Sequence, residues 1–306
     1  MIIMYHYVRL SDSFNAKVNN FYDFNLFKRN ILDLLDDGKV FLDPKSLTIE
    51  QWLEVANDQD SIVLTFDDGY IDHARLVAPF LGEIGVHGLF FVPAKILVTR
   101  EVLLVNKIHL LLNKFKGREA YLLDHLIRYL KQIEQISADG ISELKTKYFK
   151  EGKYDDAVTN FLKRVFQNQF DSHRLSLFCE SSLDDEPINF DLLRDELYMS
   201  PDDFRSLQNQ GHSLGLHGFN HHYLSSLPKA EQKIDFGESI NVFREFGISQ
   251  DLLVAYPYGD YDGDTLDICE EIKIKVGFID NRNNTSPQSP KLTLPRIDCN
   301  DFFISH

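Results

Sequence analysis

The sequence predicts an α/β protein with a parallel sheet or barrel, interrupted by a helical insertion. The first eight residues, MIIMYHYV, form an apolar run typical of a buried strand. A second such run, Ser61 to Phe66, ends abruptly in Asp67-Asp68-Gly69. Segments with helical spacing lie between these runs and after them, and this alternation of strands and helices is typical of parallel sheets.

The first part of the chain contains further elements of this alternation. One helix is predicted from apolar residues at helical spacing, closed by Gly38: Phe24, Phe27, Ile31, Leu34 and Leu35. A second helix is expected from about Tyr70 to Gly82, followed by a strand over 86–92.

The pattern changes between about Lys95 and Tyr198. Helices are predicted over 102–115, 121–133 and 157–166, without a convincing strand between them. Strands are expected again over 211–216, 252–256 and 275–279. We therefore predict one barrel-like domain made of residues 1–95 and 198–306, and a helical insertion over 96–197 that serves as a cap or as a dimerisation element.

Composition narrows the class of protein. The chain has 306 residues, 43% of them hydrophobic, with 24 Phe, which is typical of a globular protein with a large core. The formal net charge of −15 argues against a nucleic-acid partner and against an anionic membrane surface, since both need clustered Lys and Arg. The oligomeric state cannot be predicted from these numbers.

Cysteine usage and the N-terminal segment bear on location. The three cysteines, Cys179, Cys269 and Cys299, are far apart and form no CxxC pair, so we expect free thiols in a reducing compartment. The N-terminus lacks a signal-peptide pattern, and no apolar stretch reaches the roughly 18 residues that a membrane span needs. We therefore expect a cytoplasmic protein without stable membrane insertion.

Two short motifs carry the residue types of a metal-dependent hydrolase. Asp67 and Asp68 follow a buried strand, where two adjacent carboxylates need a cation or a role as a base to offset their burial; a plain turn is the alternative. His217 and His221 lie four residues apart, so a helix starting at or after His217 would place both imidazoles on one face. Two His and one carboxylate form a common catalytic zinc set, whereas a solvated helix face is the other interpretation.

A third motif, Tyr256-Pro257-Tyr258-Gly259, also follows an apolar strand. The backbone N–H of Tyr258 is a candidate hydrogen-bond donor at the edge of the site, although by itself the motif is a turn.

Taken in order, these three motifs resemble the polysaccharide deacetylase family, the NodB-homology domain of carbohydrate esterase family 4. The opening Met4-Tyr5-His6-Tyr7 resembles the circularly permuted branch that deacetylates poly-N-acetylglucosamine. The resemblance covers about two thirds of the chain, on both sides of the insertion. It implies a distorted (β/α)7 barrel with its site at the carboxyl ends of the strands.

The family resemblance also implies roles for individual residues. Asp68, His217 and His221 would bind a divalent metal, with Zn²⁺ the first choice and Co²⁺, Ni²⁺ or Mn²⁺ as alternatives. Asp67 would be the catalytic base, and the Tyr258 N–H would stabilise the oxyanion. The permuted branch takes its general acid from the first strand, which favours His6; His306, near the end of the chain, is the alternative.

The sequence departs from the family pattern in the residues that usually support the base. Ala255 stands where the family has an Arg, and the Asp-x-x-Asp-Trp motif is absent, since the only tryptophan is Trp52. Arg296 could supply the missing charge and orient Asp67, or it could be a solvated arginine.

The sequence as a whole therefore predicts metal-dependent removal of an N-acyl group, acetyl or formyl, from an amino sugar. We expect an intracellular nucleotide- or lipid-linked intermediate of O-antigen or capsule biosynthesis as the substrate. Two other interpretations stay open: an amidohydrolase of the same fold that opens imide rings such as that of allantoin, and an inactive carbohydrate-binding barrel.

Overall fold

The computed structural model describes residues 1–10, 21–152, 155–181, 188–280, 286 and 290–304. Its described residues form two compact units. Residues up to Glu101 and from Arg194 onward make the first unit, and Val102–Leu193 make the second. The first unit carries the barrel strands and the candidate site.

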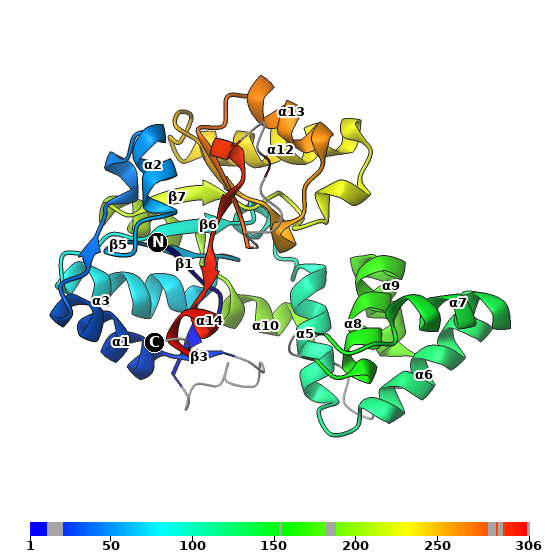
Figure 1. Ribbon diagram of the computed structural model, residues 1–306. Coiled ribbons are helices and arrows are strands. Elements are labelled where there is room, and N and C mark those ends of the chain that lie inside the picture. The colour runs from blue at the N-terminus through cyan, green and yellow to red at the C-terminus, as the bar shows by residue number, and fades with distance from the viewer. Residues whose placement is uncertain (11–20, 153–154, 182–187, 281–285, 287–289, 305–306) are drawn as a thin grey trace. The chain divides into compact units, whose positions relative to one another are not determined.

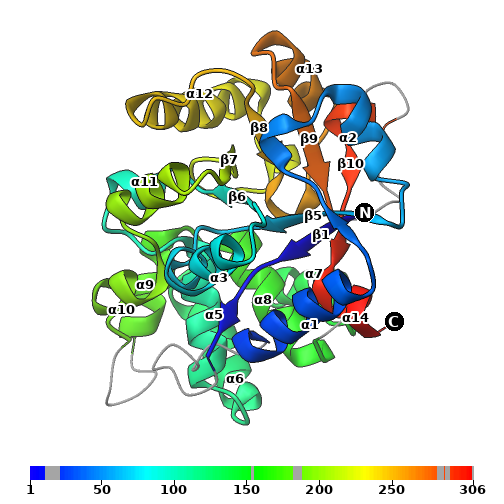
Figure 2. The same cartoon turned by 90° about the vertical axis from the view of Figure 1, so that its left-hand side faces the viewer.

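The first unit is built around a parallel sheet that curls into a barrel (Figures 1 and 2). Hydrogen-bonded neighbours follow the order β10-β9-β8-β7-β6-β5-β1-β11, and every pair is parallel. These strands are β1 (Ile2–Tyr5), β5 (Ser61–Phe66), β6 (Leu89–Val92), β7 (Ser213–Leu216), β8 (Leu253–Ala255), β9 (Val276–Ile279), β10 (Leu294–Pro295) and β11 (Ile297–Asp298). The predicted strands over 61–66, 211–216, 252–256 and 275–279 correspond to four of them.

The two ends of this order are neighbours along the chain. Strands β10 and β11 are separated only by Arg296, so they are two halves of one split strand. The first half pairs with β9, through Leu294 and Phe278, and the second half pairs with β1, through Ile297 and Ile3. The split strand thus joins the two edges of the sheet, and the predicted distorted NodB-type barrel is confirmed.

Helices cover the outside of the barrel strands (Figure 2). In chain order they are α1 (Phe24–Asp36), α2 (Ile49–Val55), α3 (Ala78–Glu83), α4 (Lys95–Val98), α11 (Pro201–Asn209), α12 (Lys229–Glu245), α13 (Gly263–Glu271) and α14 (Cys299–Ile304), with α10 (Phe190–Leu197) across the boundary of the two units. Helix α1 buries four of the five apolar residues that predicted it, and it is capped by Asp23, whose carboxylate accepts from the backbone N–H of Leu26 at 3.0 Å.

Short elements complete the unit. They are β2 (Val8–Arg9), β3 (Tyr22–Asp23), β4 (Val40–Phe41), and the 3-10 turns η2 (Pro44–Ser46), η4 (Leu224–Ser226), η5 (Pro257–Gly259) and η7 (Pro290–Leu292). The helix expected from about Tyr70 to Gly82 has a π-helical turn, η3 (His73–Val77), before α3. The strand expected over 86–92 is also shorter, because β6 begins only at Leu89.

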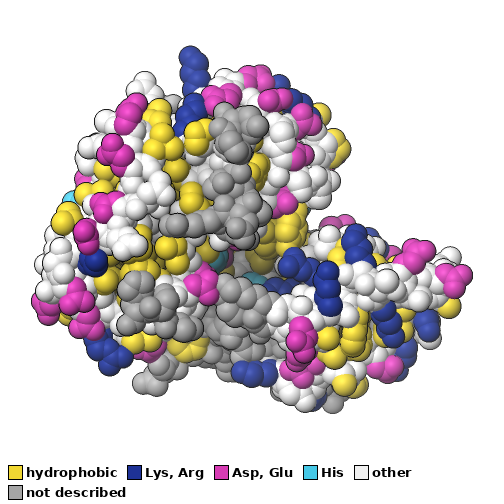
Figure 3. Space-filling view, viewed as in Figure 1, with side chains coloured by type: hydrophobic (Ala, Val, Ile, Leu, Met, Phe, Trp, Pro, Cys, Tyr) yellow, Lys and Arg dark blue, Asp and Glu magenta, His cyan; other side chains and the backbone are white. Residues whose placement is uncertain are grey.

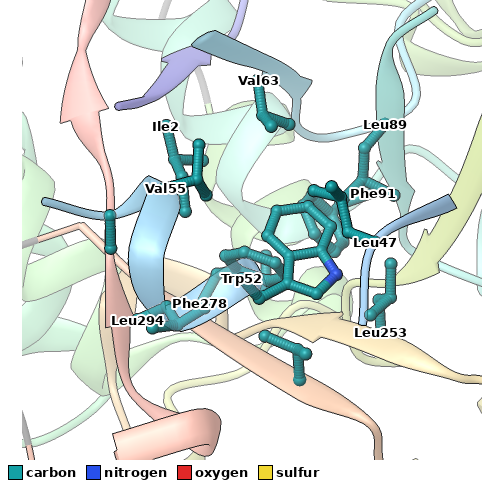
Figure 4. Packing of buried hydrophobic residues seen from close by; sticks show 13 residues of the cluster. Ile2, Leu47, Trp52, Val55, Val63, Leu89, Phe91, Leu253, Phe278 and Leu294 are labelled. Carbon is teal, nitrogen blue, oxygen red and sulfur yellow. The ribbon is translucent and has the colours of Figure 1, made fainter. Parts of the chain in front are cut away.

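The amino-terminal end of the barrel is filled by apolar side chains around Trp52 (Figure 4). Helix α2 supplies Trp52, which is fully buried, and its ring lies 5.1 Å from that of Phe278. Residues from the starts of several strands, such as Ile2 and Leu253, join the same cluster. This packing closes one end of the barrel and leaves polar side chains to the other end.

The second unit is helical. It contains α5 (Leu104–Lys114), α6 (Glu119–Gln132), α7 (Ala138–Tyr148), α8 (Ala157–Gln169) and α9 (Ser172–Glu180). Aromatic rings from α6, α8 and α9 pack together: Phe178 lies 5.1 Å from both Tyr129 and Phe166. On the face drawn in Figure 3, acidic and basic side chains are interspersed. A role for the helical segment as a cap or as a dimerisation element stays a prediction.

Two further findings concern the described part of the chain. No helix there is both long and apolar enough to cross a membrane. Cys179, Cys269 and Cys299 are all buried free thiols, and burial raises the pKa of Cys179 and of Cys269 to about 12.

His212 is a buried imidazole outside the candidate site. Its Nδ1 accepts a hydrogen bond from the backbone N–H of Gly88 at 3.1 Å, and only 3% of the residue is exposed. Burial, together with the charge of His87, lowers the pKa of His212 to about 4. The unfolded chain therefore binds more protons than the folded chain between pH 4 and 6.5.

We predict that the free energy of unfolding rises as the pH is raised from 4 to 6.5, with His212 contributing up to about 3 kcal/mol. His212→Asn keeps an acceptor for Gly88 but cannot be protonated, so the variant should depend less on pH in this window. Urea denaturation at several pH values measures this. His173→Asn, which changes an exposed histidine, is the control, and an H212N profile as steep as that of the wild type would contradict the assignment.

Candidate metal centre and active site

The site begins at the tight turn that ends β5. The backbone N–H of Asp67 still continues the sheet, since it donates to Tyr5 O at 2.9 Å, but Asp68 and Gly69 have positive φ angles of 76° and 65°. A side chain at Gly69 would meet Ile96 Cδ1 at 2.6 Å and Val92 Cγ1 at 2.9 Å. Glycine is therefore required here, and the reversal points two adjacent carboxylates into the carboxyl end of the barrel.

Asp68, His217 and His221 come together at this end of the barrel. Oδ1 of Asp68 lies 3.3 Å from Nε2 of His217 and 3.1 Å from Nε2 of His221. Each of the three residues is at most 7% exposed, and one potential ligand atom from each lies within 4.8 Å of the others. Among the described residues, this is the only group of three or more such side chains that could hold a metal ion.

The hydrogen bond of His217 orients its ring toward the cluster. Nδ1 of His217 lies 2.8 Å from the backbone O of Ala255, and a carbonyl can only accept, so Nδ1 carries the proton. Nε2 then faces Asp68, and in the neutral ring it carries the lone pair that a metal ion would use. A backbone carbonyl that fixes a histidine in this way is a common support of metal ligands.

His221 reaches the cluster without the helix that the spacing suggested. Residues 217–221 form a loop in which Gly218 and His221 have φ angles of 68° and 59°. Asp235 on α12 holds this loop, since its carboxylate accepts from the backbone N–H groups of Phe219, at 2.8 Å, and Asn220, at 3.2 Å. The helical interpretation of the His pair is therefore wrong, because the positive φ angles of Gly218 and His221 do not fit a right-handed helix.

Asp68 is held in its ionised form by its neighbours. Burial would raise the pKa of Asp68, but the close approach of His217 and then of His221 outweighs burial and holds the pKa well below its usual value. Oδ2 of Asp68 also accepts from the hydroxyl of Tyr70 at 2.7 Å. Burial, and then the charge of Asp68, raise the pKa of the Tyr70 phenol well above its usual value, so this hydroxyl keeps its proton.

Asp67 pairs with Arg296. The guanidinium donates from Nη1 to Oδ1 at 2.7 Å and from Nη2 to Oδ2 at 2.6 Å, and Nη1 also donates to Thr65 Oγ1 at 3.3 Å. Asp67 is 1% exposed and Arg296 3% exposed, so Arg296 is not a solvated arginine. Burial alone would raise the pKa of Asp67, but Arg296 and His217 outweigh it and lower the pKa.

His6 follows β1 directly and lies at the same end of the barrel. After the larger effects of burial, Arg296 and the two histidines, the imidazole of His6 makes a smaller contribution to the lowered pKa of Asp67 and of Asp68, as expected for a side chain near both carboxylates. The backbone O of His6 is 2.6 Å from Nε2 of the fully buried His73. Burial lowers the pKa of His73 to about 4, so the neutral ring donates from Nε2 to this carbonyl. His306 lies outside the described residues.

The third motif lies beside the histidines. Tyr258 has a φ of 61°, and its ring packs edge-on against that of His221 with centroids 4.7 Å apart. Tyr223 stacks on Tyr258 at 3.9 Å with nearly parallel planes. The structure thus brings Tyr258 next to the cluster, and the role of its backbone N–H stays a prediction.

The donor set fits a divalent transition metal. One carboxylate and two imidazoles are the number and type of ligands found at catalytic zinc sites. Oδ1 of Asp68 is buried without a hydrogen-bond partner, although it lies between two imidazole nitrogens. A buried acceptor of this kind requires an explanation, and a cation among the three side chains provides one.

Three supporting residues were not recognised from the sequence: Tyr70, His73 and Asp235. Tyr70 and His73 follow the Asp-Asp-Gly turn, but only the π-helical turn and the folded barrel show what they touch. Asp235 lies on a different element, 14 residues beyond His221, and no local pattern connects the two.

Comparison with known proteins agrees with this fold. The family model for polysaccharide deacetylase matches residues 153–277, which include His217, His221 and Tyr258 but neither Asp67 nor Asp68. The resemblance inferred from the motifs is therefore confirmed, and the family implies a hydrolase that acts on amides. No curated protein sequence matches the chain significantly.

Several solved structures share the fold. A Streptococcus pyogenes deacetylase, PplD, in complex with acetate is 17% identical, with a TM-score of 0.56 over 97% of this chain and 90% of that chain. IcaB from Ammonifex degensii is 15% identical, with a TM-score of 0.55 over 97% and 89%. A de-N-acetylase from Aggregatibacter actinomycetemcomitans is 14% identical, with a TM-score of 0.53 over 97% and 94%.

The buried Asp67–Arg296 pair generates a stability prediction. Arg296→Ala would leave the Asp67 carboxylate buried without its partner, so we expect the free energy of unfolding near neutral pH to fall by about 3–5 kcal/mol. The loss should shrink as the pH is lowered, because the buried carboxyl of the variant then takes up a proton. Chemical denaturation at pH 5 and pH 7.5 measures both effects.

The control for this prediction is Arg205→Ala. Arg205 is exposed and pairs with exposed Asp202 at 3.2 Å, so its removal should change the free energy of unfolding by less than about 1 kcal/mol. Equal effects of the two substitutions would contradict the buried pair.

Proposed function

We propose that the protein hydrolyses the N-acyl group of an amino sugar in a metal-dependent reaction. The observation that carries this proposal is the buried cluster of Asp68, His217 and His221, with Asp67 beside it, at the carboxyl end of the barrel. The reaction breaks a linear amide C–N bond and yields a free amino sugar and a carboxylate.

The metal would be held by Asp68, His217 and His221, with Zn²⁺ the first choice and Co²⁺, Ni²⁺ or Mn²⁺ as alternatives. When bound, a divalent cation supplies a Lewis acid that polarises the amide carbonyl and lowers the pKa of water. Asp67 is proposed as the base that takes the proton from the attacking water. Arg296 supports this role, because it fixes the carboxylate through both oxygens and keeps it ionised at neutral pH.

Arg296 does not exhaust the capacity of Asp67 to accept hydrogen bonds. Each oxygen of the carboxylate accepts one bond from the guanidinium, and an ionised carboxylate offers about four acceptor sites in all. Asp67 can therefore receive a proton while Arg296 stays in place. In this proposal Arg296 takes the part of the Arg that the family places at the position of Ala255.

The remaining steps are proposed for His6 and Tyr258. The backbone N–H of Tyr258 would donate to the oxygen that becomes negative as water adds to the carbonyl. His6, in its protonated form, would give its proton to the sugar nitrogen as the C–N bond breaks. The hydrogen bond from His73 to the backbone of His6 supports this assignment, because it fixes the segment that carries the imidazole.

For the substrate, we propose an intracellular nucleotide- or lipid-linked acylamino sugar used in surface-glycan biosynthesis, with the protein in the cytoplasm. Acetyl is the first choice for the acyl group, with formyl as the alternative. The acetate bound in the Streptococcus pyogenes deacetylase of the same fold supports acetyl, since acetate is the product of that reaction.

The test is release of acetate or formate by metal-free protein reconstituted with Zn²⁺. The panel contains nucleotide-linked, lipid-linked and free N-acylhexosamines, an oligomer of N-acetylglucosamine, and allantoin as an imide. We expect acylamino-sugar turnover that depends on added metal and is lost with chelator. Ring opening of the imide without sugar deacylation would favour the other amidohydrolase class, and a protein that neither binds metal nor turns over any substrate would be an inactive barrel.

The two adjacent carboxylates provide matched variants with different expected losses. Asp67→Asn should lower kcat by about 10²–10⁴-fold, the usual loss of a general base, with metal content unchanged. Asp68→Asn should lose the metal as well as the activity. Turnover assays and metal analysis of both purified variants measure this.

Two outcomes would contradict these roles. Loss of metal in the Asp67→Asn variant, with metal retained in Asp68→Asn, would exchange the base and the ligand. Full turnover in the Asp67→Asn variant would remove Asp67 from the reaction altogether.

A further inference from the structure

The two oxygens of Asp68 have different surroundings. Oδ1 faces the Nε2 atoms of His217 and His221 and has no hydrogen-bond partner. Oδ2 accepts from the hydroxyl of Tyr70 at 2.7 Å. A carboxylate can bind a metal through one oxygen or through both. A hydrogen bond to Oδ2 favours binding through Oδ1 alone, because it engages Oδ2.

The position of the Tyr70 hydroxyl is fixed by its surroundings. The residue is fully buried, and its ring stacks on that of Tyr7 at 3.9 Å and lies parallel to that of Tyr198 at 6.3 Å. The backbones of Tyr70 and Tyr198 form an antiparallel bridge, and Met199 N donates to Gly69 O at 3.0 Å. Ring packing and backbone bonds together therefore fix the position of the hydroxyl.

We propose that Tyr70 is a positioning residue of the metal centre, which reserves Oδ1 of Asp68 for the cation by donating to Oδ2. The inference deepens the proposed function and rests on it. Asp68 then contributes one oxygen, and the chain supplies three ligand atoms in all. The number matters because a hydrolytic site needs open positions for water and for the substrate carbonyl.

Removal of the hydroxyl would leave Oδ2 buried without its donor. The carboxylate could then turn toward the cation or draw in water, and in both cases the position of Oδ1 would no longer be fixed. Loss of such an outer partner typically costs 10–100-fold in metal affinity. The ring of Tyr70 is not needed for this effect, so Tyr70→Phe separates the hydrogen bond from the packing.

The experiment measures zinc affinity of metal-free protein by competition with a chromophoric chelator, without any substrate. We expect Tyr70→Phe to bind Zn²⁺ about 10–100-fold more weakly than the wild type. Tyr198→Phe is the matched control, since it removes a hydroxyl from a neighbouring buried ring while Tyr70 keeps its own hydroxyl on Oδ2, and its affinity should equal that of the wild type. His217→Ala marks the loss of the site.

A second measurement does not depend on how well the variant folds. In crystals of the zinc-loaded wild-type protein, Oδ1 of Asp68 should contact the ion while Oδ2 stays on Tyr70. Equal zinc affinity of Tyr70→Phe and the wild type, or contact of both oxygens with zinc, would overturn the role of Tyr70 and leave the proposed function in place. A wild-type protein that binds no zinc would overturn both.

Discussion

Two adjacent carboxylates are buried where β5 ends, and the rest of the site depends on how each is compensated. Asp67 and Asp68 are 1% and 4% exposed, and two like charges at neighbouring positions would repel each other and favour protonation. In the structure, each carboxylate has its own partners, which offset its burial and the repulsion between the two charges. Arg296 takes both oxygens of Asp67, whereas Asp68 turns away, at a φ of 76°, toward two histidines and a phenol.

The partner of Asp67, Arg296, also belongs to the strand that closes the barrel. Arg296 interrupts the strand that closes the sheet, so the residue that neutralises Asp67 also lies at the seam between β9 and β1. Its backbone N–H donates to Ile279 O at 2.9 Å, while its side chain crosses to the end of β5. The same short segment therefore closes the barrel and holds the proposed base. In the proposed function, Arg296 thereby takes the part of the Arg that the family resemblance places at Ala255.

The spacing of apolar residues along the chain predicted one strand and several helices well, because that spacing is set by the local geometry of each element. The run Ser61–Phe66 is β5 with the bounds expected, and apolar spacing located α1, α5, α6 and α8 to within a few residues. Patterns could not predict the loop of His217 and His221, because Asp235 on α12 holds it from 14 residues beyond His221.

For the candidate site, the sequence likewise predicted the residues within short motifs but not their partners from distant parts of the chain. Its residue types were visible in three motifs, and these placed Asp68, His217 and His221 in one region. The partner of Asp67 could only be suggested, because Arg296 lies 229 residues away along the chain. No sequence pattern predicted a role for Tyr70. Its hydroxyl contacts one oxygen of Asp68, and this contact is visible only in the folded structure.

The most direct test of the proposed metal centre is a crystal structure of zinc-loaded protein with diffraction data on both sides of the zinc absorption edge. We expect an anomalous peak in contact with Oδ1 of Asp68 and with Nε2 of both His217 and His221. A map without a peak at these atoms, or with zinc bound elsewhere on the barrel, would contradict the proposed metal centre.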